Sequence, residues 1–259
     1  MPWRQWRACT LGILRTVPAQ IDELAAQFGV SRMTVHRDLD ALASQRIVRR
    51  VHDGVTVRSS NPVESNFLCR SRLAEHEKQA IAFAAAELVE PGQAIIIDDS
   101  TTAGRLTSSI PARKPMTVTT NSVTVVEQLN ESHGIETICL GGRYNPRFNT
   151  FFGHVCEQAI SSLRANTLSM SASTEFSGVA YHQQEDVVKT ERALMGVADK
   201  RVLLVDSSKF GVTALIRLAD LSEFDVVLTD SGVAPTEAEM LHQNGVNLRI
   251  AEAEPTEAG

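Results

Sequence analysis

The segment VSRMTVHRDLDAL, residues 30–42, decides the fold of the N-terminal part of the chain. Its second residue, Ser31, is a type that commonly precedes a helix, because the hydroxyl accepts a hydrogen bond from an amide of the first turn. Val35, Leu39 and Leu42 then recur at the spacing of one helical face, and the opposite face is polar and basic. The segment therefore predicts an amphipathic helix that starts directly after Ser31.

A second short helix is expected upstream, over residues 20–28, where apolar residues recur at helical spacing and Gly29 follows as a stop. Residues 3–14 can supply a supporting helix that Pro18 would end. Two short helices joined by a tight turn that contains glycine, the second of them basic at its start, form a helix-turn-helix. In that motif the second helix lies in the major groove of DNA.

The pattern changes after Gln45, because two β-prone runs flank Asp53-Gly54 over residues 47–57. Asp-Gly between such runs is a typical hairpin turn. A hairpin behind a recognition helix makes a winged helix-turn-helix, in which arginines contact phosphates and side chains at the helix start reach base edges. The predicted DNA contacts are Ser31, Arg32, Thr34, His36, Arg37, Arg49, Arg50 and His52. The alternative is an ordinary three-helix module that binds another protein.

Charge is divided unequally along the chain. The whole chain has a net charge of −6, yet residues 1–60 hold nine arginines against five acids, a net charge of +4. The remaining residues therefore carry −10. A basic N-terminal part joined to an acidic body is expected where only the first of them meets a polyanion.

Other features of the sequence argue against whole classes of protein. No apolar run approaches the ~20 residues of a membrane helix, and the N-terminus does not have the pattern of a secretory signal. The four cysteines, Cys9, Cys69, Cys139 and Cys156, are far apart and show no metal-ligand spacing. We therefore expect a cytoplasmic protein with reduced thiols and with no metal, cofactor or membrane partner.

The rest of the chain alternates between short β-rich and helical patterns. Residues 59–67 have no apolar periodicity and separate residues 1–58 from a larger domain at 68–259. A long helix is predicted at 68–90. The predicted strands are at 94–98, 116–120, 136–140, 167–170, 202–206, 226–229 and 247–250, and the helices between them at 102–109, 122–132, 155–163, 185–195 and 236–244. This alternation indicates an α/β domain with a mostly parallel sheet.

Polar loops follow several of these strands at their carboxyl ends, where α/β sheets bind ligands. They comprise residues 98–102, 120–122, 141–143 and 206–211. Hydroxyls, glycines and amides at such positions suit a phosphate, Lys209 can add a point charge, and the carboxylates of Asp98, Asp99 and Asp206 can accept sugar hydroxyls. The combination suits a small phosphorylated polyol or sugar. Taken singly, each loop has a simpler interpretation, since Ser, Thr and Asp commonly cap helices and Gly-Gly commonly forms a turn.

These segments resemble the DeoR family of bacterial sugar-metabolism regulators. The similarity covers residues 23–54, with Val30-Ser31, Thr34 and Arg37-Asp38-Leu39 at its centre, and then runs from about Arg70 to Asp230 through Glu77-Lys78 and the four polar loops. The resemblance implies a winged helix-turn-helix followed by a sensor domain similar in fold to ribose-5-phosphate isomerase. It also implies that a sugar phosphate contacts Asp98, Ser100, Thr101, Thr102, Asn121, Ser122, Gly141, Gly142 and Lys209, with Lys189 as a further candidate.

The sequence departs from the pattern of that family at four places. His36 stands where the family has an arginine, and Asp53 replaces the first glycine of the wing, so operator preference can differ. Ser100 stands where the sensor loop usually has glycine, which restricts backbone approach to a ligand. Residues 169–176, around Ser173, lack the usual glycine as well. The last two departures leave open a changed or weakened response to the effector.

The leading hypothesis is therefore a transcription regulator, in particular a repressor of a carbohydrate-metabolism operon. It would bind double-stranded operator DNA as a homo-oligomer, a dimer or a tetramer, and respond to a phosphorylated sugar. An enzyme is not expected. One alternative is a sugar-phosphate isomerase fused to a DNA-binding head, for which Asp98, Asp99 and Lys209 offer acid–base groups. The other is a regulator that has lost its effector and binds DNA constitutively.

Overall fold

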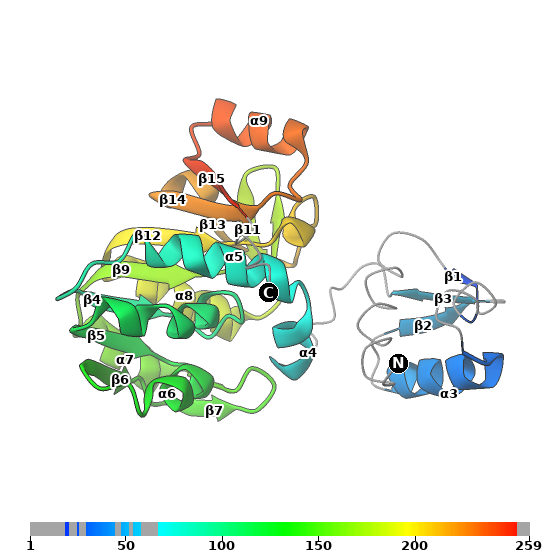
Figure 1. The fold of residues 1–259 in the computed structure, drawn as a ribbon, viewed down its shortest axis with the longest axis horizontal. Helices are drawn as coiled ribbons and strands as arrows, with labels where there is room; N and C mark the ends of the chain where they lie inside the picture. The colour runs from blue at the N-terminus through cyan, green and yellow to red at the C-terminus, as the bar shows by residue number, and fades with distance from the viewer. Residues whose placement is uncertain are drawn as a thin grey trace, which may run out of the picture. The chain divides into compact units, whose positions relative to one another are not determined.

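The chain forms two compact units, Met1–Ser65 and Asn66–Gly259, in the computed structural model (Figure 1). The structure describes the backbone of residues 19–20, 25, 30–44, 48–51, 54–57 and 67–252. Side chains are described at residues 25, 30–37, 40, 67 and 70–252. Each unit has a sheet of its own.

The N-terminal unit combines a helix with a small antiparallel sheet. Its elements are α3 (Arg32–Ser44), β1 (Ala19–Gln20), β2 (Val48–Val51) and β3 (Gly54–Val57). Strands β2 and β3 form an antiparallel pair in which Val51 lies opposite Gly54. The helix predicted after Ser31 and the hairpin behind it are therefore confirmed. The helix predicted at residues 20–28 is wrong at Gln20, which pairs with β3 as part of β1, whereas Ala25 is helical.

Side chains at the start of α3 account for where this helix begins. The Ser31 hydroxyl accepts a 3.1 Å hydrogen bond from the amide of Thr34, which satisfies one of the amides left free at a helix start. Val35 is fully buried, as its place on the apolar face predicts. The side chains of Leu39 and Leu42, the helix predicted at residues 3–14 and residues 59–66 of the predicted linker lie outside the described part of the chain.

The larger unit is built on a seven-stranded parallel sheet with the order β15-β14-β12-β9-β4-β5-β6. Its strands are β4 (Ala94–Ile97), β5 (Met116–Thr120), β6 (Ile135–Cys139), β9 (Ala165–Met170), β12 (Ala198–Leu204), β14 (Val226–Asp230) and β15 (Leu248–Ala251). Each of these strands corresponds to one that the sequence predicts. The parallel α/β fold is therefore confirmed.

Helices cover both faces of this sheet, which explains why its inner strand β4 is apolar throughout. Ile95 and Ile97 pack into the core beneath α5 (Glu75–Ala86), and Ile96 packs into the core on the other face, with α7 (His154–Ser161) and α8 (Glu185–Gly196) (Figure 1). Since both faces are buried, no polar alternation is needed. Further along the described chain follow η1 (Ala103–Ser108), η2 (Ile110–Arg113), α6 (Val123–Leu129), η3 (Ser207–Lys209), η4 (Leu221–Glu223) and α9 (Pro235–Gln243).

The long helix predicted at residues 68–90 is wrong as a single element. The structure has two helices, α4 (Phe67–Arg72) and α5, and the chain turns between them at Ala74, whose φ of 51° lies in the left-handed region. Neither glycine nor proline marks this break, so helical periodicity alone runs across it. The helix predicted at residues 102–109 is confirmed in place, but it is the 3₁₀ helix η1.

Two small antiparallel sheets were not predicted. They consist of β7 (Arg143–Asn145) with β8 (Thr150–Phe152), and of β10 (Thr174–Phe176), β11 (Val179–His182) and β13 (Ile216–Asp220). Strands of three to five residues are too short for alternation of polar and apolar side chains to be distinctive. Within the described residues, no helix is long and apolar enough to cross a membrane.

Candidate functional site

A buried carboxylate, that of Asp98, follows β4, an inner strand of the parallel sheet. One oxygen of Asp98 accepts hydrogen bonds from the amide and the hydroxyl of Ser100, at 3.0 and 2.6 Å. Its other oxygen accepts a 3.0 Å hydrogen bond from the amide of Ser171, just beyond β9. Thr102, also buried, precedes η1. The structure therefore brings the predicted Asp98 and Ser100 together, and Asp98 ties the loops of two neighbouring strands to each other.

Asn121 and Ser122 extend this arrangement to the loop after β5. The Asn121 amide nitrogen donates to the carbonyl of Phe151 at 3.2 Å and lies 3.5 Å from a carboxylate oxygen of Asp99. Its side-chain oxygen is buried without a hydrogen-bond partner among the described residues. Ser122 caps α6 by accepting a hydrogen bond from the amide of Val125 at 3.5 Å. The simple capping role considered for these residues is thus present, and one buried acceptor remains unused.

Lys78 of α5 reaches the loop after β4, although the sequence analysis did not include it among the site residues. Its ammonium donates to the hydroxyl of Thr101 at 3.0 Å and to the backbone carbonyl of Arg70 at 2.5 Å. Only 3% of Lys78 is exposed. This lysine falls at helical spacing with the buried Ile81 and Ala85, and charged residues almost never occupy such an apolar stripe without a partner. That position is the signal by which the sequence could have identified it.

Three other cationic side chains lie within electrostatic reach of Lys78. Burial lowers the pKa of Lys78 to about 7, an effect that Asp206 partly opposes. The positive charges of Lys209, Arg70 and Arg105 lower this pKa further. Because these cations disfavour the charge on Lys78, an anion placed beside it would relieve their effect.

The two carboxyl groups after β4 are shifted in the opposite direction. Burial raises the pKa of Asp98 to about 7, and the charge on Asp99 adds to the rise. Burial also raises the pKa of Asp99, against the opposing effects of Arg70 and His182. Near neutral pH the Asp98 carboxyl group is therefore close to the point at which it changes between an acceptor and, when protonated, a donor.

The loop after β12 contributes a carboxylate and a lysine. Asp206 accepts hydrogen bonds from the amide of Ser208, at 3.2 Å, and from its hydroxyl. Lys209 lies at the end of η3, and its charge acts on Lys78. The structure thus brings the predicted Lys209 into the same cluster as the loop after β4.

The remaining predicted effector residues lie further along the sheet edge and on a helix. Gly142, after β6, has a φ of +146°, and a side chain there would approach the carbonyl oxygen of Phe152 to 2.7 Å, so this turn requires glycine. Gly141 beside it is exposed. Lys189 is exposed on α8 and forms an ion pair of 2.7 Å with Glu185 of the same helix.

At the start of α3, the predicted DNA contacts divide into a cap and an exposed basic surface. The hydroxyl oxygens of Ser31 and Thr34 lie 2.9 Å apart, so both take part in the cap. Arg32 and Arg37 are exposed, and His36 is half-buried. The two arginines are therefore the members of this group that the helix presents to solvent.

One further residue of α3 was missed, and three predicted ones cannot be placed in detail. Met33 is 79% exposed beside the basic surface, and an exposed apolar side chain at the start of a recognition helix suits the methyl group of thymine. Arg49 and Arg50 lie on β2, opposite Thr56 and Val55, but their side chains are outside the described ones. His52 lies outside the described residues.

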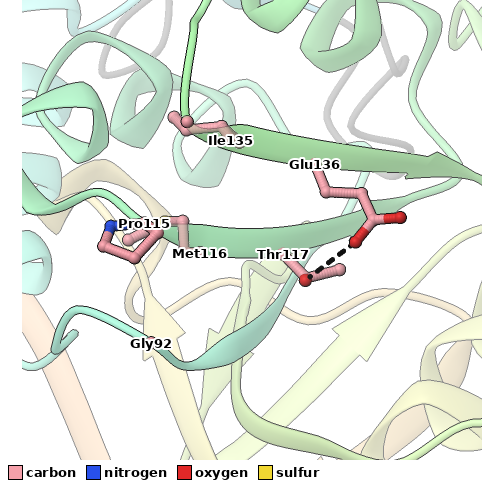
Figure 2. A pocket seen from close by; sticks show the side chains of 7 residues that line it. Gly92, Pro115, Met116, Thr117, Ile135 and Glu136 are labelled. Carbon is pink, nitrogen blue, oxygen red and sulfur yellow. Dashed lines mark hydrogen bonds between the residues drawn. The ribbon is translucent and has the colours of Figure 1, made fainter.

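A hollow of about 440 Å³ lies at the amino ends of β4, β5 and β6, the opposite edge of the sheet (Figure 2). It is lined by Gly92, Pro115, Met116, Thr117, Gly134, Ile135 and Glu136. The hydroxyl of Thr117 donates to the carboxylate of Glu136 at 3.5 Å. This lining contains a carboxylate and no cationic side chain, so it does not suit a phosphorylated ligand.

Metal or thiol chemistry finds little support in the part of the chain that the structure describes. There, no group of three or more His, Cys, Asp or Glu side chains is arranged to hold a metal ion. Cys139 and Cys156 are unbridged, and burial raises the pKa of the Cys156 thiol to about 11. That thiol is therefore protonated at neutral pH and unreactive.

Two family models match the chain. The model described as the DeoR C terminal sensor domain matches residues 73–231, and the model described as the DeoR-like helix-turn-helix domain matches residues 13–61. The first match includes Lys78, the loop after β4 and Lys209. The second includes α3 and the hairpin behind it.

Relatives along most of the chain are named as operon regulators. The chain is 31% identical over 213 residues to the L-fucose operon activator of Haemophilus influenzae, covering 82% of this chain and 85% of that protein. It is 30% identical over 227 residues to the lactose phosphotransferase system repressor of Lactococcus lactis, covering 86% and 89%. It is 28% identical over 244 residues to the glycerol-3-phosphate regulon repressor of Escherichia coli, covering 92% and 96%. Among solved structures, ribose 5-phosphate isomerase A from Neisseria gonorrhoeae is similar, with 16% identity, a TM-score of 0.39, and coverage of 53% of this chain and 54% of that one.

Proposed function

This chain belongs to the DeoR family of transcription regulators, and from that premise we propose that it represses a carbohydrate-metabolism operon under the control of a phosphorylated sugar. The N-terminal unit would bind operator DNA, and the larger unit would bind the effector. The observation that carries the choice of effector is the cluster of four cationic side chains beside the buried carboxyl groups of Asp98 and Asp99.

The proposed contact with DNA is supported by the surface of α3. This helix starts at a capped Ser31 and exposes Arg32 and Arg37, while Val35 anchors its other face. Arginines in this position form charge-assisted hydrogen bonds with phosphates or bidentate hydrogen bonds with guanine. The hairpin of β2 and β3 supplies the wing, with Arg49 and Arg50 as proposed phosphate contacts.

The proposed phosphate position is supported by the electrostatics around Lys78. A buried ammonium with a pKa of about 7 is close to losing its charge, and nearby cations contribute to that shift. A phosphate dianion among Lys78, Arg105 and Lys209 would reverse the effect, because an opposite charge favours the protonated ammonium. The hydroxyl of Thr101 accepts a hydrogen bond from Lys78 and so helps to position this ammonium.

The proposed sugar position is supported by the acceptors on the other side of the loop after β4. Asp99 and the unpaired side-chain oxygen of Asn121 are buried and can accept hydrogen bonds from sugar hydroxyls. A ligand with hydroxyl groups at one end and a phosphate at the other would meet complementary groups along this edge. A bare inorganic anion would leave the buried side-chain oxygen of Asn121 without a hydrogen-bond donor.

Binding without turnover is proposed because Asp98, one of the two buried carboxyl groups, is already committed to structure. Both oxygens of Asp98 accept hydrogen bonds from the protein, from Ser100 and from Ser171. A general base must instead be free to reach the proton that it abstracts. The named relatives are regulators as well. Turnover of ribose 5-phosphate by the purified full chain would revive the isomerase alternative.

Repression, oligomerisation and location complete the proposal. Two of the relatives above are named repressors and one is named an activator, so repression is the more frequent outcome among them. Regulators of this type bind operators whose two-fold symmetry matches their own, and we therefore propose a dimer or tetramer that acts in the cytoplasm.

Fluorescence anisotropy with the full chain and the DNA upstream of its own gene tests this function. We expect affinity to fall steeply with added salt, because arginine–phosphate contacts release counterions. We also expect a sugar phosphate to change this affinity at concentrations where the unphosphorylated sugar has no effect. Equal binding to unrelated DNA would overturn the regulatory role, and indifference to every sugar phosphate would overturn the choice of effector.

A further inference from the structure

Helix α4 is held in place by side chains of the proposed effector site. The backbone carbonyl of Arg70 accepts hydrogen bonds from Lys78 at 2.5 Å and from the Thr101 hydroxyl at 3.4 Å. The carbonyl of Ser71 accepts a 2.8 Å hydrogen bond from Arg105. These carbonyls belong to the last turn of a six-residue helix, where no amide of the helix itself can satisfy them. Cationic groups of the site therefore cap the C-terminus of α4.

The side chain of Arg70 has hydrogen-bond donors to spare. Its guanidinium lies over the buried ring of Phe148, with 4.9 Å between the Cζ atom and the ring centroid. Its charge lowers the pKa of both Asp99 and Lys78, so it lies within electrostatic reach of both groups. Yet Nε and Nη2 are buried and form no hydrogen bond with any described residue. Buried donors of this kind cost free energy until an acceptor reaches them.

We propose that Arg70 binds the anionic group of the effector together with Lys78 and Arg105, and that binding thereby clamps α4 onto the larger unit. The inference rests on the proposed function. It adds Arg70 as a residue that contacts the effector, and it adds a way in which the protein senses that the effector is bound. A planar guanidinium whose Nε and Nη2 donors pair with none of the described residues suits the geometry of a phosphate.

The number of hydrogen-bond donors on Lys78 indicates that a bound anion would hold α4 in place and would not release it. An ammonium has three N–H donors, and Lys78 uses two of them on Thr101 and on the Arg70 carbonyl. The third can reach an anion without breaking the contact with α4. The anion would then receive donors from both sides of that contact, from Arg70 on α4 and from Lys78 on α5.

The position of α4 in the chain gives this clamp a consequence. The boundary between the two units lies between Ser65 and Asn66, and α4 begins at Phe67. A change in how firmly α4 is held therefore acts directly on the segment that connects the larger unit with the DNA-binding unit. By linkage, whatever effector binding does to DNA affinity, DNA binding does equally to effector affinity.

Calorimetry on the full chain tests the proposed ligand, with inorganic phosphate, glycerol 3-phosphate and fructose 6-phosphate as separate probes. We expect Arg70→Met to weaken the probes that bind roughly 10- to 100-fold, as expected for the loss of hydrogen bonds to a charged group. The control is Arg72→Met, which removes an exposed arginine from the same helix and should leave affinity unchanged. Equal affinity of the wild type and Arg70→Met would overturn the inference and leave the proposed function standing. Failure of every probe to bind the wild type would overturn both.

Hydrogen exchange tests the clamp separately. Amides of residues 67–73 should exchange more slowly when a probe is bound to the wild type, and at an unchanged rate in Arg70→Met. Faster exchange on binding would show that the anion displaces α4 and would overturn the clamp. If Arg70→Met does not fold, Arg70→Lys carries the test, because it keeps the charge but loses the planar fork. Wild-type affinity and wild-type protection in that variant would overturn the inference.

Discussion

The ammonium of Lys78 donates a 3.0 Å hydrogen bond to the hydroxyl of Thr101, across 23 positions of sequence. One group comes from the helix α5, which covers a face of the sheet, and the other from the loop at the carboxyl end of the inner strand β4. This contact joins the cationic part of the proposed effector site to its hydroxyl-rich loop. It also makes Lys78 the residue whose replacement tests the site most directly.

Lys78→Met should abolish the effect of sugar phosphates on DNA binding while leaving DNA affinity in their absence close to that of the wild type. The expected loss of effector affinity is roughly 10- to 100-fold, because a charged hydrogen-bond donor is replaced by an apolar side chain of similar length. Lys189→Met is the matched control, since Lys189 is exposed and paired with Glu185. A larger loss in the control than in Lys78→Met, measured by calorimetry, would place the phosphate elsewhere.

Effector affinity should depend on pH with a definite sign. Burial lowers the pKa of Lys78 to about 7, so in the free protein the ammonium loses its proton as the pH rises through that value. A phosphate monoester is a dianion above about pH 6 and favours the protonated form of the lysine. Binding should therefore be tightest near pH 6–7, weaken towards pH 9, and take up a proton above pH 7. Calorimetry in buffers of different ionisation enthalpy measures that uptake, and release of a proton would contradict the assignment.

Much of the fold follows from local pattern. The run Ile95-Ile96-Ile97 between turn residues predicts a strand buried on both faces, and Ser31 followed by Val35 predicts the start of α3. The break at Ala74 could not be foreseen, because an alanine in the left-handed region is stabilised by tertiary contacts and not by its own preference. Helical periodicity that runs through such a residue predicts one helix where there are two.

The sequence predicts only those residues of the candidate site that lie in loops directly after the strands. The rule that ligands bind at the carboxyl edge of a parallel sheet leads to Asp98 and Lys209. Arg70 and Lys78 come from helices that precede the sheet in sequence, and only the packing of α4 and α5 brings them to that edge. Lys78 can be recognised in the sequence, because it is a lysine within an apolar helical stripe. No local sequence pattern distinguishes Arg70.

Ser100→Gly, which restores the residue usual in the family, should destabilise this chain. The Ser100 hydroxyl donates to Asp98 at 2.6 Å and accepts a hydrogen bond from the amide of Ala103 at 3.1 Å, and glycine loses both bonds. We expect a loss of about 1–2 kcal/mol in the free energy of unfolding, measured with urea. Ser100→Ala is the control, because it removes the hydroxyl without adding the backbone freedom of glycine. An unchanged free energy of unfolding in Ser100→Ala would show that the hydroxyl contributes nothing.

Glu175→Gln should stabilise the chain at pH 8 and not at pH 5. Burial raises the pKa of Glu175 to about 7, and one of its oxygens is buried without a hydrogen-bond partner among the described residues. Because this pKa is above the value in the unfolded chain, the stability supplied by the protonated form is complete at low pH. It is lost as the pH rises through 7.

Glutamine resembles the protonated form and keeps an oxygen for the amide of Gly178, so a gain of about 1–2 kcal/mol is expected at pH 8. Urea denaturation at the two pH values measures it, with the exposed Glu127→Gln as control; the same gain at both pH values would contradict the assignment.

His36→Arg should strengthen DNA binding and steepen its dependence on salt. His36 lies half-buried on α3 between the exposed Arg32 and Arg37, at a position where the family has an arginine. A permanent positive charge there would add about one phosphate contact, so the slope of log affinity against log salt should become more negative by about 0.9. His76→Arg adds the same charge to α5 of the other unit, where the histidine is exposed, and should leave the slope unchanged.

Anisotropy measured across a salt series, on operator and on unrelated DNA, separates a phosphate contact from a base contact, because only the latter changes the ratio of the two affinities. An unchanged slope with unchanged affinity would mean that residue 36 does not meet DNA, and that Arg32 and Arg37 make the contacts of this helix without it.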